Sequence, residues 1–372
     1  MDVKFAPAKR VAGQRQDVWS IVNEAAAASP MQPIVNMGQG FFGYNPPQFI
    51  IDAAKSMLSA FMGFIEPGDE VIIFEPFFDQ YLSNIEMPGG TIRYVPMHPP
   101  ADGAERTSSA ANWTIDFDEL EKAFNSKTKM IVLNSPHNPV GKVLNKEELT
   151  KIGDLCLKHK VIILSDEVYD RLYYVPFTRI ATLSPELAKI TITVGSAGKN
   201  FYATGWRVGY LIGPPELIKY VAAAHTRICY SSVSPLQEAA AIGFEQADKV
   251  GFWDQQIKEM KGKMDRFCQI FDELDVPYSV PEGGYFVLAN LSKVKLPEAY
   301  KFPDHVKDRP RDFKMSWFLI MELGVAAIPP SEFYTDERAH LAEDWMRFAV
   351  CKNDDVLEDA KDRLRGLKKY MS

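Results

Sequence analysis

The sequence predicts an α/β protein whose large domain holds a mostly parallel sheet flanked by helices, with a smaller α+β domain beside it. The first observation is that short apolar runs alternate with helical patterns between Val71 and Gly213, which is typical of parallel sheets. The second is a long helical pattern that ends at prolines and precedes further short strands. The third is size, because 372 residues of 46% hydrophobic content can bury enough core for two domains.

The elements of the large domain follow from these patterns. Strands are expected at 71–75, 130–133, 161–165, 191–195 and 208–212. A crossover helix is expected at 146–160, because Asn145 can cap it and Leu149, Ile152 and Cys156 recur on one face.

The second region begins after one long helix, expected over 237–274 and stopped by Pro277 and Pro281. Short strands are expected at 285–288, 325–328 and 347–350, with a helix at 355–368. The predicted domains are therefore residues 56–275 for the large one, and 1–55 with 276–372 for the small one.

Composition excludes several classes of function. A formal net charge of -7 and a pI near 5.5 provide no basic surface for nucleic acid. The four cysteines form no CxxC pair and have no histidines at ligand spacing, so no metal site and no disulfide framework are predicted. No apolar run approaches the roughly 20 residues of a membrane helix. We expect a cytoplasmic protein without a membrane partner, with a mitochondrial location as the alternative.

The segment from Ser196 to Lys199 follows a predicted strand directly and contains the first candidate catalytic residue. A lysine amine is a nucleophile only when it is unprotonated and held in place, which a strand-end loop can achieve. Two other interpretations stay open at this point: a solvated loop lysine, and the S-x-x-K motif of penicillin-binding enzymes, whose partner motifs S-D-N and K-T-G the chain lacks.

Polar residues also end two neighbouring predicted strands. Asp166 ends one of them, and a buried carboxylate there would need a cation such as a protonated pyridine nitrogen, although a salt bridge or a helix cap would also explain it. Tyr169 follows three residues later and could reach a ring oxygen or simply pack. Asn138 follows the other strand. Open α/β sheets bind ligands at the carboxyl ends of their strands, so Asn138, Asp166 and Lys199 are expected to meet there.

Two further motifs have competing interpretations. Residues 38–43 match the dinucleotide fingerprint G-x-G-x-x-G, but Pro46 and Pro47 follow where that fingerprint requires a helix. An oxidoreductase is therefore disfavoured. Arg347, at a late strand, could bind a carboxylate with its planar fork or form a surface salt bridge.

Together, these motifs resemble the fold-type I pyridoxal-phosphate (PLP) aminotransferases of class I/II, and in particular the group of kynurenine aminotransferase, glutamine transaminase K and cysteine-S-conjugate β-lyase. The resemblance covers nearly the whole chain. It rests on the motifs at 36–41, 67–70, 75–81, 134–141, 165–169, 196–209, 282–286, 324–329 and 347–348.

The resemblance implies a PLP-dependent enzyme that transfers nitrogen from kynurenine to 2-oxoglutarate and forms kynurenate, with cysteine-S-conjugate β-lyase as a side activity. Its partners would be amino acids, 2-oxo acids and a second copy in a homodimer. Lys199 would be the Schiff-base lysine and proton carrier, and Asp166 would pair with the pyridine nitrogen. In the cofactor, the ring oxygen would be bound by Asn138 and Tyr169, the ring face would stack on Phe78, and the phosphate would be held by Ser196 and Arg207. The substrate carboxylate would be held by Gly40, Asn138 and Arg347.

The chain departs from this group at one place. Relatives have several tens of residues between the positions of Lys55 and Ser56, including a strand and a Thr-Gly-Ala turn whose amides hold the phosphate at a helix N-terminus. Here a helix is expected to start at Ser56 without that turn. The alternative prediction is thus a truncated, non-catalytic paralogue, isoform or gene-model product that holds PLP weakly.

Overall fold

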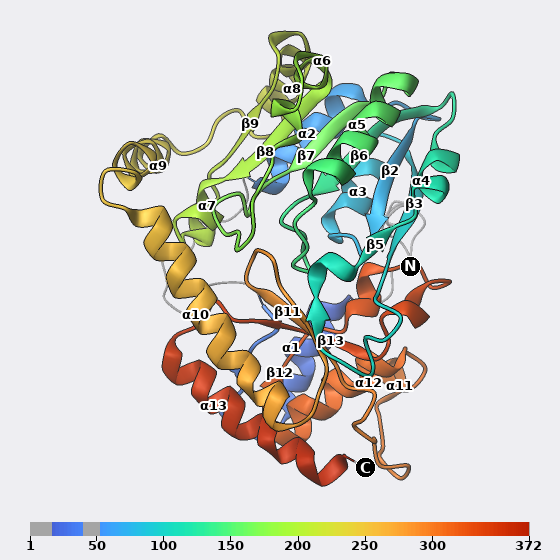
Figure 1. Cartoon of the computed structure of the whole chain (residues 1–372), viewed down its shortest axis with the longest axis vertical. Coiled ribbons are helices and arrows are strands. Elements are labelled where there is room, and N and C mark those ends of the chain that lie inside the picture. The colour runs from blue at the N-terminus through green and yellow to red at the C-terminus, as the bar shows by residue number, and fades with distance from the viewer. Residues whose placement is uncertain (1–16, 40–52, 372) are drawn as a thin grey trace, which may run out of the picture.

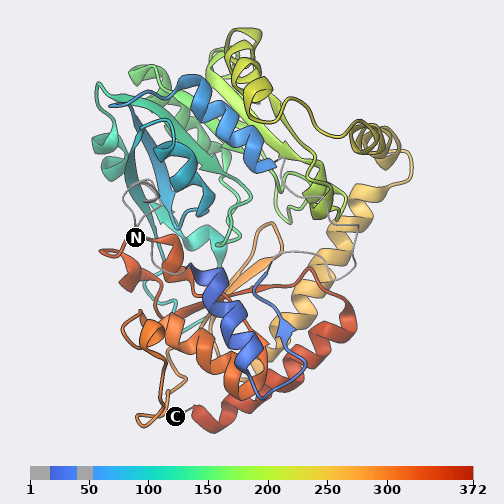
Figure 2. The same cartoon turned by 180° about the vertical axis from the view of Figure 1, so that it is seen from behind.

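A computed structural model describes residues 17–39 and 53–371 of the chain. These residues form two main β-sheets, one above the other in Figure 1, and helices surround each of them (Figures 1 and 2). The larger sheet has seven strands and lies in the upper part of Figure 1. Its strands, in spatial order, are β5 (Thr114–Ile115), β3 (Thr91–His98), β2 (Glu70–Glu75), β6 (Thr128–Asn134), β7 (Ile162–Asp166), β8 (Thr191–Ser196) and β9 (Gly209–Ile212). All neighbouring pairs are parallel except those of the two edge strands, β5 and β9. The predicted α/β fold class is confirmed.

Helices cover this sheet, and each of its two faces packs against a different hydrophobic cluster. Met130 and Val132 face one cluster, while Ile131 faces the other. Such two-sided burial explains why the central strands are continuous apolar runs. The helices of this part are α2 (Ala53–Phe64), α3 (Gln80–Glu86), α4 (Phe117–Ala123), α5 (Lys146–His159), α6 (Pro185–Ile190), α7 (Ala197–Asn200) and α8 (Pro215–Ile228).

Helix α5 confirms the predicted crossover helix. Asn145 accepts a hydrogen bond from the backbone of Glu148 at 2.9 Å, and the Glu148 side chain accepts one from the backbone of Asn145 at 2.9 Å. This reciprocal capping box satisfies two amides that the helix cannot pair internally.

The second sheet lies in the lower part of Figure 1 and has the order β13 (Trp345–Ala349), β11 (Phe286–Asn290), β10 (Tyr278–Val280) and β4 (Ser108–Ser109). A separate pair joins β1 (Val35–Asn36) to β12 (Val325–Ala326). The helices around these strands are α1 (Val18–Ala28), α11 (Asp304–Lys307), α12 (Arg311–Phe318) and α13 (Asp354–Leu364). Strand β4 belongs to the second sheet although it lies within residues 56–275, which were predicted to form the large domain. The division into domains at residue 275 therefore stays a prediction.

Two predicted helices differ from the observed ones. The single helix expected over 237–274 is wrong, because α9 (Ser234–Ala247) and α10 (Phe252–Glu273) are separated by a turn in which Gly251 has a φ of 65°. Only glycine adopts that backbone conformation without strain. The expected start at Ser56 is also wrong, because α2 begins at Ala53 and continues through the junction of Lys55 and Ser56. Alanine and lysine both favour helix, so the junction is locally well formed.

Candidate active site

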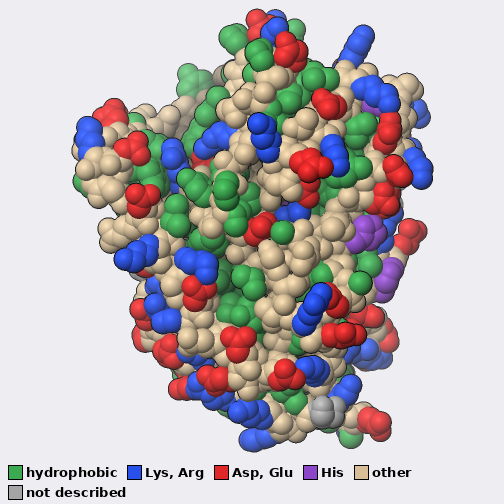
Figure 3. Space-filling model, viewed as in Figure 1, with side chains coloured by type: hydrophobic (Ala, Val, Ile, Leu, Met, Phe, Trp, Pro, Cys, Tyr) green, Lys and Arg blue, Asp and Glu red, His purple; other side chains and the backbone are tan. Residues whose placement is uncertain are grey.

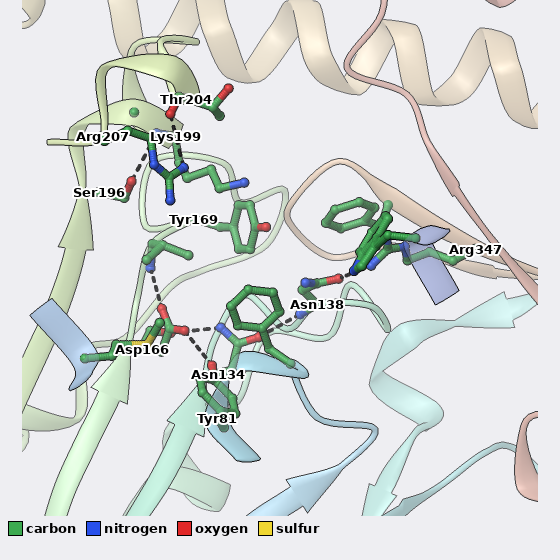
Figure 4. A pocket seen from close by; sticks show the side chains of 16 residues that line it. Tyr81, Asn134, Asn138, Asp166, Tyr169, Ser196, Lys199, Thr204, Arg207 and Arg347 are labelled. Atoms are coloured by element: carbon green, nitrogen blue, oxygen red, sulfur yellow. Dashed lines mark hydrogen bonds between the residues drawn. The ribbon is translucent and has the colours of Figure 1, made fainter. Parts of the chain in front are cut away.

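A cavity opens at the carboxyl ends of the central strands, between the two sheets (Figure 4). It measures about 920 Å³ when the space open to solvent is included. The side chains that line it are those of Trp19, Met57, Phe78, Tyr81, Asn134, Asn138, Asp166, Val168, Tyr169, Ser196, Lys199, Thr204, Arg207, Phe286 and Arg347. All predicted site residues within the described part of the chain lie in this list. Gly40 lies outside the described residues.

The ends of β6 and β7 bring the first polar groups together. Asn134 and Asp166 are paired in register at the ends of these strands. The Asn134 amide donates to the backbone oxygen of Asp166 at 3.1 Å, and its oxygen accepts from the backbone of Asn138 at 2.8 Å. Asn134 therefore ties the loop of Asn138 to the neighbouring strand.

Asp166 is 3% exposed and forms no ion pair with any described residue. The Tyr81 hydroxyl donates to its carboxylate at 2.5 Å, and the backbone of Val168 donates at 3.3 Å. Burial raises the pKa of Asp166 to about 6, while the bond from Tyr81 opposes that rise. The salt-bridge interpretation of this residue is wrong. Asp166 is instead an ionisable carboxylate that faces the cavity, and no cation of the residues that the structure describes lies at hydrogen-bonding distance from it.

Lys199 lies in α7, directly after β8, and points into the same cavity (Figure 4). Its amine lies 5.4 Å from the ring centre of Tyr169 and donates to the Tyr285 hydroxyl at 2.8 Å. Burial lowers the pKa of Lys199 to about 8. At neutral pH a larger fraction of this amine is uncharged than in an exposed lysine, as a nucleophile requires. The interpretation as a solvated loop lysine is wrong.

Ser196 and Arg207 lie together on the Lys199 side of the cavity (Figure 4). Arg207 has a φ of 57° and donates to the backbone oxygen of Thr204 at 3.2 Å. A guanidinium and a hydroxyl at one end of a cavity form a suitable site for an anion such as a phosphate.

Arg347 enters the cavity from β13 and is 3% exposed. Its guanidinium donates to the side-chain oxygen of Asn138 at 3.1 Å and to the backbone oxygen of Gly38 at 2.9 Å. The guanidinium carbon also lies 4.4 Å from the ring centre of Phe286. Burial lowers the pKa of Arg347 to about 10. The alternative of a surface salt bridge is therefore wrong, and a buried cation that forms no ion pair with a described carboxylate faces the cavity.

Several lining residues were not predicted from the sequence, notably Trp19, Tyr81, Thr204 and Phe286. Tyr81 lies three residues after Phe78 in the same sequence motif, which is the one signal that placed it near the site. Their rings meet edge to face at 5.6 Å. Trp19 comes from α1, far away in sequence, and no local pattern indicated its place.

The polar side chains of the cavity fit the chemical groups of pyridoxal phosphate. The cofactor carries an anionic phosphate, a basic ring nitrogen, a phenolic oxygen and an aldehyde carbon. The cavity offers Ser196 and Arg207 for the phosphate, the unpaired carboxylate of Asp166 for the nitrogen, Tyr169 and Asn138 for the oxygen, and the Lys199 amine for the aldehyde. No cluster of three potential metal-ligating side chains, and no helix able to span a membrane, occurs among the described residues.

Comparison with known proteins identifies the family. The profile of the family Aminotransferase class I and II matches residues 45–364. The chain belongs to this family. Over 96% of its length it is 46% identical to the probable kynurenine-oxoglutarate transaminase BNA3 of Saccharomyces cerevisiae, and 93% of that protein is covered. It is also 34% identical to human kynurenine-oxoglutarate transaminase 3, over 98% of this chain and 91% of the relative. It is thus an aminotransferase of the kynurenine-oxoglutarate transaminase family.

Structural comparison agrees with this assignment. The crystal structure of Bna3p, described as a putative kynurenine aminotransferase from Saccharomyces cerevisiae, matches with a TM-score of 0.95 at 45% identity, covering 98% of this chain and 99% of that one. The sequence alignment with the yeast relative extends over 413 positions, more than the 372 residues of this chain. That relative therefore contains residues that have no counterpart here.

Proposed function

We propose that this aminotransferase uses pyridoxal phosphate, bound covalently through Lys199, to move the amino group of kynurenine to 2-oxoglutarate. The observation that carries the proposal is the cavity itself, where a lysine of lowered pKa, a buried unpaired carboxylate and a buried arginine meet. These three groups would respectively attach the cofactor, hold its ring nitrogen and bind the substrate carboxylate.

Each group has a defined task in the transfer. When bound, the cofactor supplies an electron sink for the charge that develops at the substrate Cα. Asp166 keeps the ring nitrogen protonated, and Tyr169 and Asn138 donate to the ring oxygen. The Lys199 amine would take the proton from the substrate Cα and deliver it to C4′ of the cofactor. Arg347 and Asn138 fix the carboxylate, so that the Cα proton faces the lysine.

The aromatic lining favours a flat amino donor. Trp19, Phe78, Tyr81 and Phe286 surround the cavity, and Arg347 lies 5.8 Å from the ring of Trp19. An aryl side chain such as that of kynurenine would bury its ring against these faces. Cysteine-S-conjugate β-lyase activity, homodimer formation and the cellular location stay predictions.

The absorption spectrum of the purified chain tests the proposal. With added pyridoxal phosphate we expect a visible band of the lysine-bound cofactor, its loss on adding kynurenine, and its return with 2-oxoglutarate. Lys199→Ala should never form the band, whereas Lys189→Ala, which changes an exposed lysine, should behave like the wild type. A band that persists in Lys199→Ala would refute the role of Lys199. No band in the wild type would instead favour the truncated, non-catalytic alternative.

A further inference from the structure

Tyr285 is a buried tyrosine beside Lys199 that the proposed chemistry does not use. It belongs to the Glu282–Phe286 motif of the sequence, has 0% exposure, and accepts a hydrogen bond from the Lys199 amine at 2.8 Å. The rings of Tyr285 and Tyr169 meet edge to face at 5.3 Å. Lys199 is thus hydrogen-bonded to Tyr285, and the Tyr285 ring packs against that of Tyr169.

The backbone before Tyr285 is held in place by the large sheet's loops. The amide of Gly284 donates to the oxygen of Leu172 at 2.8 Å, and the Tyr174 hydroxyl donates to the oxygen of Gly284 at 2.5 Å. A Cβ on Gly283 would lie 2.7 Å from Pro136, and Gly284 has a φ of 72°. The two glycines therefore permit a close approach that fixes where the next side chain points.

On its other side, Tyr285 is held by the second sheet. Its backbone oxygen accepts from Val350 at 2.9 Å, and its ring packs against Phe286 at 4.7 Å. A side chain fixed from both sides can hold a flexible lysine amine in one position, which four rotatable bonds would otherwise leave mobile.

We propose that Tyr285 is a positioning residue of this aminotransferase, which holds the released Lys199 amine beside the reacting carbon. The inference rests on the proposed attachment of pyridoxal phosphate to Lys199.

Tyr285→Phe tests this role, since it retains the ring and removes the hydroxyl. Loss of an acceptor for the ammonium form should lower the pKa of Lys199, so that the rate of cofactor attachment to the apoprotein reaches its plateau at lower pH. We expect kcat to fall about tenfold while the KM for kynurenine changes less than about twofold. The isotope effect with Cα-deuterated kynurenine should increase, because proton transfer becomes slower.

A matched control is Tyr334→Phe, which changes a buried tyrosine whose hydroxyl has no hydrogen-bond partner among the described residues. It should leave the pH profile and the isotope effect unchanged. If Tyr285→Phe proves too unstable to assay, 3-fluorotyrosine at position 285 retains the hydroxyl but makes it a weaker acceptor, and it should move the pH profile in the same direction.

The outcomes separate this inference from the proposed function. A wild type without a lysine-bound band contradicts the proposed function and, with it, the premise of this inference. A wild-type band together with an unchanged pH profile and isotope effect in Tyr285→Phe overturns the role of Tyr285 alone. A fall in kcat without either change would show a merely structural role and would also overturn it.

Discussion

At the scale of single residues, the site depends on hydrogen bonds between buried groups that have few other partners. Tyr81 and Asp166 show this directly. The phenol contributes the shorter hydrogen bond to the carboxylate, and it keeps the carboxylate pKa lower than burial alone would set it. The tyrosine therefore favours the charged form of Asp166, the form that a protonated ring nitrogen needs.

Tyr81→Phe should consequently raise the pKa of Asp166 above its present value of about 6. The carboxylate would then be protonated at higher pH, so the affinity for pyridoxal phosphate should begin to fall at a higher pH than in the wild type. Cofactor titrations between about pH 5 and 8 would measure this. Tyr94→Phe, which changes a half-buried tyrosine of β3, is the control. If the affinity for pyridoxal phosphate falls over the same acidic pH range in Tyr81→Phe and in the wild type, the prediction is contradicted.

His137 leads to a prediction about stability. It is 7% exposed, and burial together with nearby Lys142 lowers its pKa from 6.5 to about 3. Between pH 6.5 and about pH 3, His137 therefore binds a proton in the unfolded chain but stays neutral in the folded chain. As the pH falls through this range, His137 lowers the free energy of unfolding.

His137→Gln should remove that contribution, which has a slope of up to about 1.4 kcal/mol per pH unit. Urea unfolding at about pH 4, 5, 6 and 7 would measure this contribution, because these values cover most of the pH range over which it changes. The difference between the two proteins isolates His137 from the buried carboxyl groups, which act in the opposite direction. A parallel pH dependence in both proteins would show that His137 is protonated in the fold.

At the scale of elements, glycines decide where helices break. Gly251 lies between α9 and α10 with a φ of 65°, and a Cβ there would meet no atom within 4 Å. Gly262 lies inside α10, where a Cβ would meet only the Arg266 guanidinium at 3.4 Å. The space around both positions is open, so backbone conformation alone distinguishes them.

Alanine at these two positions should have opposite effects on stability. Gly251→Ala should lower the free energy of unfolding by about 1 kcal/mol, because a left-handed conformation strains alanine. Gly262→Ala should raise it by about 0.5–1 kcal/mol, because alanine favours helix. Urea denaturation of both variants tests the pair. If both variants change the free energy of unfolding in the same direction, the turn at Gly251 is not maintained in solution.

At the scale of the whole molecule, apolar side chains lie exposed on α9 and the loops beside it. Tyr230, Val233, Ile242 and Val250 are between 49% and 80% exposed. Figure 1 shows α9 extending from the body of the molecule. Figure 3 shows charged side chains of both signs over most of this face, with hydrophobic side chains among them beside the α9 region at the left. Exposed apolar groups gathered in one region are typical of an interface, which agrees with the homodimer predicted from the sequence.

We therefore expect a mass in solution of twice the 41.9 kDa of one chain. The double variant Tyr230→Lys with Val233→Glu should shift the mass toward that of a single chain, because it places charges in an apolar interface. Sedimentation equilibrium would measure both, with Lys189→Ala as a surface control. A monomeric wild type would contradict the prediction. An unchanged dimer in the double variant would place the interface elsewhere.

The sequence by itself determined five strands of the large sheet, which are β2, β6, β7, β8 and β9, and the motifs at the strand ends, but it did not predict β3 and β5. Asn138, Asp166 and Lys199 were predicted to meet because parallel strands deliver their carboxyl ends to one edge, and these residues do line one cavity. Periodicity and capping residues act locally, so they are readable from the chain alone. The break at Gly251 was missed because a lone glycine interrupts a helical pattern only weakly.

Only the tertiary structure decided which side chains touch. The contacts of Tyr81 with Asp166, Lys199 with Tyr285 and Arg347 with Asn138 join residues 85, 86 and 209 positions apart. No local pattern encodes such pairs, because they arise when elements that are distant in the sequence pack around one cavity. Burial likewise belongs to the folded molecule, and it shifts the pKa values of Asp166, Lys199 and Arg347 by removing their charges from water. The sequence determined which groups are present, and packing determined what they can do.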